Sequence, residues 1–233
     1  MPLYPIAFHV LHFPKGTRFP GLKQFVCLRS VLPAAPGARF AKVMGCGRGA
    51  VFSIRPDWSR YAFLVEWESA DAAQAFYRGA DWQRAEKSAG SQHHLLLQPF
   101  HSKGLWDGKP RFSEKAGPLK SDLMAVITRA DLKPWKLRSF FSYARKATLA
   151  LNGQQGLRFS LGMGEWPFVR QATFSIWDSA EAMKGYAYQN QAHIDAMRSK
   201  NQQRWYGEEM YARFGILKEN RESASALWEQ TNL

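Results

Sequence analysis

Apolar and polar residues alternate along short stretches of this chain, and stretches with helical spacing separate them. The segments 5–12 and 123–130 are apolar runs with partial alternation, which predicts β-strands. Apolar residues then recur every three or four positions in "LKQFVCLRSVLP" (22–33) and "PWKLRSFFSYARKATLAL" (134–151). These stretches predict amphipathic helices, and the proline near the front of the second suits a first helical turn.

A hairpin, a second helix and a last strand follow in each half. The hairpin strands, rich in Phe, Val and Ile, are predicted at 39–53 and 60–67, and at 157–163 and 170–177. Ser69 and Ser179, each with acidic residues close by, are predicted to cap the second helices. The last strands are predicted at 93–100 and 208–217.

The two halves also share sequence. Trp67 and Trp177, at an offset of 110, both begin a pattern of Trp, acid, Ser, Ala, acid, Ala. "RFAKVMG" (39–45) matches "RFSLGMG" (158–164) at an offset of 119. We assign the difference between the two offsets to a longer hairpin loop around "RPDW" (55–58) in the first half.

The predicted fold class is therefore α+β, with tandem ferredoxin-like repeats (βαββαβ twice) forming an intrachain dimeric α/β-barrel. Each antiparallel sheet has helices on one face, and two copies in one chain can cover each other's remaining face. The predicted boundaries are a first repeat at 1–100, a linker at 101–122, a second repeat at 123–218 and a C-terminal tail at 219–233.

The composition of the chain restricts its expected cellular compartment and its expected binding partners. The only cysteines, Cys27 and Cys46, exclude a disulfide framework, and no signal peptide or membrane-spanning stretch is recognisable, so we expect a cytoplasmic protein. The net charge is +13, and residues 1–50 carry Lys and Arg but no Asp or Glu. Such a segment suits an acidic protein or an anionic membrane, with a solvated basic face as the alternative. No nucleic-acid-binding signature is present, so nucleic acid is not expected.

Most candidate motifs favour ordinary structure. The glycines of "GCGRGA" (45–50) precede a predicted strand and turn, whereas a phosphate-binding loop needs a helix there, so we predict a hairpin bulge. No Gly-x-Ser-x-Gly elbow supports a serine nucleophile. Five of the six histidines are predicted to be core or surface residues: His9, His12, His93, His94 and His101.

His193 is the remaining histidine, and it lies in a predicted helix. Asp195 is two residues away and points to nearly the opposite side, which argues against an iron site of the His-x-Asp type. The equivalent position in the first half is Gln83, so the halves have diverged here. From the pattern alone, core filler, proton carrier and metal ligand all stay open.

The run "TFSIWDSAEAMKGYAYQNQAHIDAMRSKNQQRWYGEEMYARFGIL" (173–217) resembles the C-terminal signature of the spheroidene monooxygenase family, carotenoid-oxidising proteins of bacterial pigment pathways. The resembling positions are Phe174, Trp177, Ser179, Ala182, Met183, Tyr186, Ala187, Tyr188, His193, Arg204, Trp205, Tyr206, Glu208, Glu209, Ala212, Arg213 and Phe214. "RFSLGMGEWPF" (158–168) resembles the preceding strand of the family. The chain departs from the family at Gly207 and Tyr211, where serine and phenylalanine are usual.

The resemblance implies an oxygen-dependent, haem-dependent monooxygenase acting on a carotenoid or similar apolar substrate, with a ferredoxin-type electron donor. It makes His193 the expected proximal ligand of the iron, because a neutral imidazole on a packed helix suits an axial position. Arg198 and Arg204 are the expected partners of the haem propionates, with solvated surface arginines as the alternative.

An apolar substrate pocket is expected from the aromatic residues of the same block, although core packing explains them equally well. These residues are Tyr186, Tyr188, Trp205 and Tyr206. Two other functions stay open: a haem enzyme of the same barrel with a non-carotenoid substrate, and a cofactor-free module that binds an apolar ligand. Peripheral contact with an anionic membrane at its inner face is a further expectation for the basic segment.

Overall fold

The computed structural model describes residues 4–49, 53, 55–112, 122–151, 153–166, 168–189, 194–195, 198 and 205–224. The chain is a mixed α+β protein, as predicted, and it divides into two compact units. Unit 1 comprises residues 1–46, 57–98 and 216–233, and unit 2 comprises residues 47–56 and 99–215.

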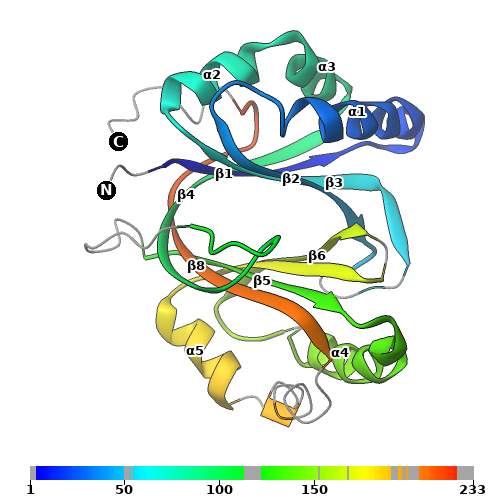
Figure 1. Ribbon diagram of the computed structural model, residues 1–233, viewed down its shortest axis with the longest axis vertical. Helices are drawn as coiled ribbons and strands as arrows, with labels where there is room; N and C mark the ends of the chain where they lie inside the picture. The colour runs from blue at the N-terminus through cyan, green and yellow to red at the C-terminus, as the bar shows by residue number, and fades with distance from the viewer. Residues whose placement is uncertain are drawn as a thin grey trace. The chain divides into compact units, whose positions relative to one another are not determined.

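Unit 1 is an antiparallel sheet with helices on one face (Figure 1). Its strands are β1 (Ile6–His12), β2 (Ala38–Gly47), β3 (Pro56–Trp67) and β4 (Ser91–Gly104). β3 and β4 flank β1, so that His9 lies opposite both Phe63 and His94, and β2 lies beside β3. Its helices are η1 (Lys15–Thr17), α1 (Arg18–Val31), α2 (Ala70–Arg78) and α3 (Ala80–Ser88).

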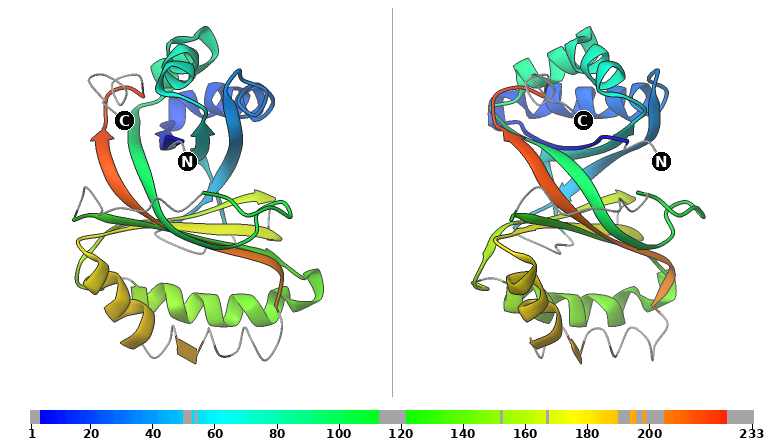
Figure 2. Two further views of the ribbon diagram at one scale, coloured as in Figure 1. Left: turned by 60° about the vertical axis from the view of Figure 1, so that its left-hand side comes forward. Right: turned by 90° about the vertical axis from the view of Figure 1, so that its left-hand side faces the viewer.

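Unit 2 has the same order of elements. Its strands are β5 (Met124–Leu132), β6 (Leu157–Trp166), β7 (Arg170–Trp177) and β8 (Tyr206–Asn220). β7 and β8 flank β5, so that Thr128 lies opposite both Thr173 and Tyr211, and β6 pairs with β7. Its helices η2 (Pro134–Lys136), α4 (Leu137–Leu151) and α5 (Ala180–Gln189) follow the same plan, with α4 and α5 on one face of the strands (Figure 2).

The predicted serine caps of the second helices are confirmed. The hydroxyl oxygen of Ser69 accepts a hydrogen bond from the backbone amide of Ala72 at 3.1 Å. Ser179 accepts one from the amide of Ala182 at the same distance, 3.1 Å. Each serine satisfies an amide of the first turn, which would otherwise have no partner within the helix.

The structure differs from the prediction at several element boundaries. The strand predicted at 39–53 ends at Gly47, and the first helix begins at Arg18, before the predicted start. The second helix of the first half is two helices, because Gly79 takes an extended conformation (φ −69°, ψ 154°) between α2 and α3. β3 begins at Pro56, so the extra length of this hairpin lies partly in the strand. β4 continues to Gly104, beyond the predicted strand end. Among the described residues, no helix is long and apolar enough to cross a bilayer.

A glycine in each unit allows the second helix to approach the turn before a hairpin strand. Gly37 and Gly156 have φ values of +78° and +79°. A Cβ atom at Gly37 would lie 2.5 Å from the Cβ of Ala72, and one at Gly156 would lie 2.5 Å from the Cβ of Ala182. Only glycine combines this backbone conformation with so close a contact.

We expect Gly37→Ala and Gly156→Ala each to lower the free energy of unfolding by at least about 1–2 kcal/mol, because alanine is strained at positive φ and its methyl group would collide with the helix. Urea unfolding followed by circular dichroism measures this. Gly45→Ala is the matched control, since a Cβ there meets no atom within 4 Å, and it should stay within about 0.5 kcal/mol of the wild type. Equal stability of all three variants would contradict the expectation.

Candidate active site

One apolar cluster of unit 2 joins α5 to the start of β5 and the end of β7. Its buried members are Met124, Val126, Leu151, Trp177 and Met183. Tyr186 stacks on Trp177, with 5.5 Å between the ring centroids and an interplanar angle of 29°. Burial raises the pKa of Tyr186 to about 12, so its hydroxyl stays protonated at physiological pH.

A second apolar cluster lies at the other end of β5, against α4. Its buried members are Leu132, Phe140, Ala144 and Trp205. The Trp205 side chain is 1% exposed and its indole nitrogen donates to the hydroxyl of Ser139 at 3.2 Å. The Tyr206 ring packs beside Phe140, with 6.1 Å between the centroids. Burial, and secondly the charge of Glu209, raise the pKa of Tyr206.

Between the two clusters, the helix-facing side of β5 carries an exposed residue. Thr128 is exposed, although Val126 and Ala130 on the same side of the strand are buried. Its cross-strand neighbours Thr173 and Tyr211 are only half-buried. A central strand is normally covered by the helices of its layer. We call these three side chains, Thr128, Thr173 and Tyr211, the Thr128 surface, and they are accessible to a ligand.

The equivalent positions of unit 1 are closed. When Trp67 at the end of β3 is aligned with Trp177 at the end of β7, Phe63 corresponds to Thr173. The cross-strand neighbours His9 and His94 then correspond to Thr128 and Tyr211. None of these three residues of unit 1 is more than 1% exposed. The His9 ring lies 4.8 Å from Tyr77 and 4.9 Å from Trp82 of the covering helices, measured between ring centroids. Unit 1 therefore fills with large rings the space that unit 2 lines with two threonines and a tyrosine.

Arg213 borders the Thr128 surface on β8 and was missed as an individual site residue by sequence reasoning. Its guanidinium carbon lies 5.8 Å from the ring centroid of Tyr211 and 5.7 Å from that of Phe100. Its Nε is buried and has no hydrogen-bond partner among the described residues. A cation with an unused donor beside an accessible surface can bind an anionic group of a ligand. Its place in the family-like block was the only sequence signal.

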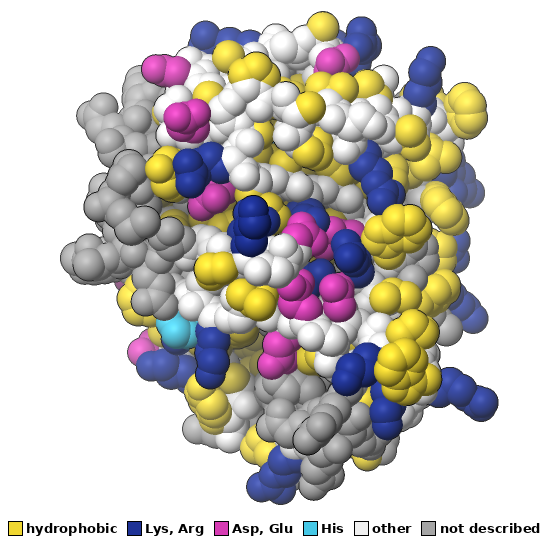
Figure 3. All heavy atoms as spheres, viewed as in Figure 1, with side chains coloured by type: hydrophobic (Ala, Val, Ile, Leu, Met, Phe, Trp, Pro, Cys, Tyr) yellow, Lys and Arg dark blue, Asp and Glu magenta, His cyan; other side chains and the backbone are white. Residues whose placement is uncertain are grey.

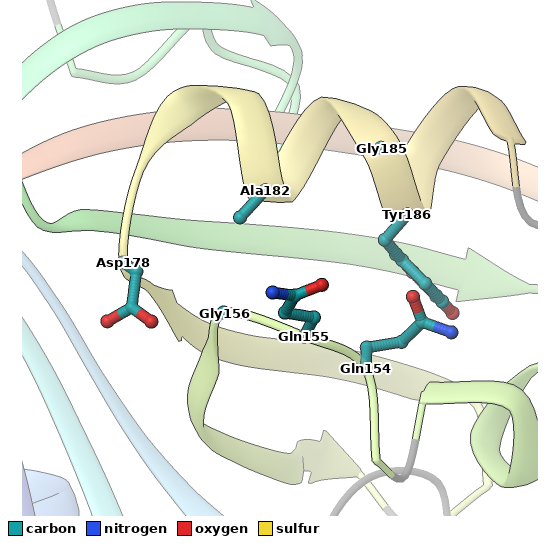
Figure 4. Close-up of a pocket in the computed structure, with 7 residues that line it drawn as sticks. All are labelled: Gln154, Gln155, Gly156, Asp178, Ala182, Gly185 and Tyr186. Atoms are coloured by element: carbon teal, nitrogen blue, oxygen red, sulfur yellow. The ribbon is translucent and has the colours of Figure 1, made fainter.

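Tyr186 also lines a pocket of about 530 Å³ (Figure 4). The lining residues are Gln154, Gln155, Gly156, Asp178, Ala182, Gly185 and Tyr186. Figure 4 shows the Tyr186 ring and the Gln154 amide extending toward each other, with Asp178 at the far end. The lining includes two side-chain amides and one carboxylate, so the pocket can hold a polar group and is less suited to a long hydrocarbon.

The four aromatic residues expected to line one substrate pocket do not all lie together. Tyr186 lies in the first apolar cluster and Trp205 in the second, with Tyr206 packed against it. Tyr188 is 76% exposed on α5. These residues therefore lie at two places on the helix-facing side of unit 2 and do not form one wall.

His193, the expected iron ligand, lies outside the described residues. Arg204, one of the two arginines expected to bind the haem propionates, also lies outside them. Arg198 is exposed in a short helical stretch. Among the described residues, no three His, Cys, Asp or Glu side chains are grouped so that they can hold a metal ion.

A buried arginine on the opposite face of the unit 2 sheet was also missed. Arg129 is 1% exposed and pairs with Glu208 and, at 2.6 Å, with Asp131. Glu208 also accepts hydrogen bonds from the amides of Asp107 at 3.0 Å and Gly108 at 2.6 Å. Burial opposes ionisation of Glu208, but these amides and the guanidinium hold its pKa below the usual value. Arg129 thus anchors the segment after β4 to the sheet.

Two buried histidines of unit 1 form a chain of hydrogen bonds. Nδ1 of His9 lies 2.9 Å from Nδ1 of His94, and Nε2 of His9 lies 2.7 Å from the Tyr77 hydroxyl. Nε2 of His94 faces the Gln92 amide oxygen at 3.2 Å, which can only accept, so this nitrogen carries the proton. Burial, then the charge of neighbouring histidines, lowers the pKa of His94 to about 3 and that of His9 well below its usual value. Both rings are buried in the core, in agreement with the prediction of core or surface residues, and both are neutral.

Proteins named as spheroidene monooxygenases have sequences similar to this chain. The spheroidene monooxygenase of Rhodobacter capsulatus is 32% identical over 199 residues, which cover 84% of this chain and 83% of that protein. That of Cereibacter sphaeroides is 35% identical over 188 residues, or 78% of this chain and 57% of that protein. This chain belongs to the spheroidene monooxygenase family. It is therefore a monooxygenase and an oxygen-dependent oxidoreductase, as predicted. No family model matches the chain.

A solved structure shares the fold without close sequence similarity. The crystal structure of an aldoxime dehydratase is 12% identical to this chain, with a TM-score of 0.62, and the match covers 92% of this chain and 82% of that one. Identity at this level shows a common fold and nothing of the reaction.

We expect the free energy of unfolding to fall as the pH is lowered below about 6.5. The unfolded chain protonates its histidines there, whereas native His94, with its pKa lowered to about 3, does not. The unfolded state then binds more protons, so stability falls by up to about 1.4 kcal/mol per pH unit for such a group. Urea titrations between neutral and mildly acidic pH measure the slope, and His94→Gln should flatten it. A slope that is unchanged in His94→Gln would contradict this account.

Proposed function

We propose that this protein is a haem-dependent monooxygenase that inserts oxygen into a carotenoid or similar apolar substrate, with His193 as the proximal iron ligand and a ferredoxin-type electron donor. The membership of the family supports the substrate class, since the relatives are named for spheroidene. The Thr128 surface is the observation that carries the proposal, because it leaves one side of unit 2 accessible where unit 1 is filled.

The described residues fit a flat and largely apolar group. Thr128 and Thr173 have short side chains, so a planar ring system can approach the sheet there. Aromatic side chains lie at both ends of the surface, Trp177 toward one and Trp205 toward the other, and both belong to apolar clusters. A site with apolar edges and a few polar groups is typical for such cofactors.

A haem also carries two carboxylates that need cationic partners. The unused Nε donor of Arg213 makes it a candidate partner on the sheet side. Arg198 and Arg204 remain the candidates proposed from the sequence. Haem would supply the oxygen-activating chemistry when bound, while Trp177 and Tyr186 would exclude water from one edge of the site.

We further propose that the two units are tandem ferredoxin-like repeats that form an intrachain dimeric α/β-barrel. The strand order within each unit supports this architecture: β4–β1–β3–β2 in unit 1 and β8–β5–β7–β6 in unit 2. A ferredoxin-like βαββαβ chain gives this order when its first strand lies between the third and the fourth.

We expect haem-loaded wild-type protein to show a Soret band, and His193→Ala to lose or strongly shift it, because the axial imidazole is removed. Haem titration followed by absorption spectroscopy measures this, and His12→Ala in unit 1 is the matched control. A folded wild-type protein that binds no haem would overturn the proposal. Carotenoid oxidation by the loaded protein, with a reductant and O2, then separates the carotenoid substrate from other apolar substrates.

Filling the Thr128 surface should prevent haem binding without unfolding the protein. Thr173→Phe places in unit 2 the residue type that Phe63 provides in unit 1, and we expect at least an about tenfold loss of haem affinity, or about 1.4 kcal/mol. Thr173→Ser keeps the small side chain and should bind haem as the wild type does. If Thr173→Phe binds haem normally and remains folded, the cofactor lies elsewhere.

A further inference from the structure

Large aromatic side chains are exposed at one end of the unit 2 sheet. Trp135 of η2 is 75% exposed, Trp166 at the end of β6 is 57% exposed and Phe168 in the following turn is 46% exposed. The backbone brings these segments together. The amide of Leu132 donates to the carbonyl of Val169 at 2.7 Å, which places η2 beside the turn between β6 and β7.

The turn holds one of these rings in an unfavourable backbone conformation. Phe168 has φ +67°, a region that bulky residues rarely adopt. Its exposed ring gains little from burial in return. Backbone strain occurs preferentially at functional sites, and the exposed ring is available to contact another molecule.

Cations accompany the aromatic side chains. Lys133, Lys136 and Arg138 lie on or beside η2, and the first turns of η2 and α4 contain no acidic residue. Arg138 is exposed, and both lysines are half-buried. We call this end of unit 2 the aromatic–basic face; it comprises Trp135, Trp166, Phe168, Lys133, Lys136 and Arg138. Hydrophobic side chains and Lys and Arg gather at the right of Figure 3, over the ends of β6 and α4.

Unit 1 has the same chemistry at the equivalent place. The amide of Phe13 donates to the carbonyl of Ser59 at 2.7 Å, as Leu132 does to Val169 in unit 2. Trp58, which directly precedes Ser59, is 58% exposed, and Phe19 in the first turn of α1 is 80% exposed. The nearby cations are Lys15, Arg18 and Lys23, all exposed. The two units differ in their cores but both present indole or phenyl rings with cations here.

A lipid surface fits these groups better than a protein partner does. Tryptophan is enriched at the interface between bilayer and water, and Lys and Arg side chains reach from apolar surfaces to anionic headgroups. The aromatic side chains come from η2, from the end of β6 and from the turn that follows it, and each is at least 46% exposed. A protein partner would need a broad, closely matched patch, whereas mobile lipid headgroups adapt to such protrusions.

We propose that the aromatic–basic face of unit 2 binds the headgroup region of an anionic lipid bilayer. This inference goes beyond the monooxygenase reaction and does not depend on haem. It assigns the contact to Trp135, Trp166 and the cations of η2 and α4, rather than to the basic N-terminal segment alone. An apolar substrate dissolved in a bilayer would then be near the enzyme.

The test is sedimentation of the full chain, without haem or substrate, with vesicles of phosphatidylcholine or of phosphatidylcholine and phosphatidylglycerol in about equal amounts. We expect binding to the mixed vesicles that weakens with added salt. Trp135→Ala with Trp166→Ala, and separately Lys136→Ala with Arg138→Ala, should each weaken it at least about tenfold. Trp135→Phe with Trp166→Phe keeps an aromatic ring at both positions and should retain most of the binding.

The control variants shorten an exposed apolar side chain and an exposed lysine that lie outside the aromatic–basic face. Val26 is 59% exposed on α1, and Lys184 is exposed on α5, so Val26→Ala and Lys184→Ala should bind as the wild type does. His193→Ala should also bind normally, which separates this test from that of the proposed function. No binding to the mixed vesicles, or binding unchanged in both double alanine variants, overturns the proposal. Binding to an acidic ferredoxin that is weakened in both double alanine variants, without binding to the vesicles, assigns the face to a protein partner and also overturns the proposal.

Discussion

The space between a sheet and its helices must be filled by side chains or by something else, and the size of the strand residues decides which. In unit 1 the rings of His9 and Phe63 reach the helices and leave almost no exposed surface. In unit 2 the equivalent residues are Thr128 and Thr173, which are too short to do so. The proposed cofactor site depends on this difference in side-chain volume.

The helices of unit 2 cannot simply move inward to compensate for the smaller side chains. The start of α5 is held by the Ser179 cap and by the close contact between Gly156 and Ala182, which match the contacts of Ser69 and Gly37 in unit 1. The serine cap and the glycine contact are the same in both units, and they fix the start of this helix relative to the sheet. The space left by the smaller side chains therefore stays accessible, because the helices do not pack closer to the sheet.

Two arginines of unit 2 show how pairing separates a structural role from a binding role. The Nε of Arg129 makes no hydrogen bond within the described residues, but its two terminal nitrogens pair with the carboxylates of Asp131 and Glu208, so this fully buried arginine stabilises the fold. Arg213, on the other face, has a buried Nε without a partner among the described residues. Burying such a donor is unfavourable, which is acceptable where a ligand supplies the acceptor.

The sequence alone predicted the α+β class, the order of the elements, the serine caps at Ser69 and Ser179, and the family. Local rules carry these features: alternation specifies strands, a hydroxyl beside an acid starts a helix, and an ordered block of residues identifies relatives. The exposure of Thr128 and the unused donor of Arg213 depended on the tertiary structure. A threonine in a strand can lie under a helix or in solvent, and a guanidinium is paired or unpaired according to residues distant in the chain, so neither property is encoded locally.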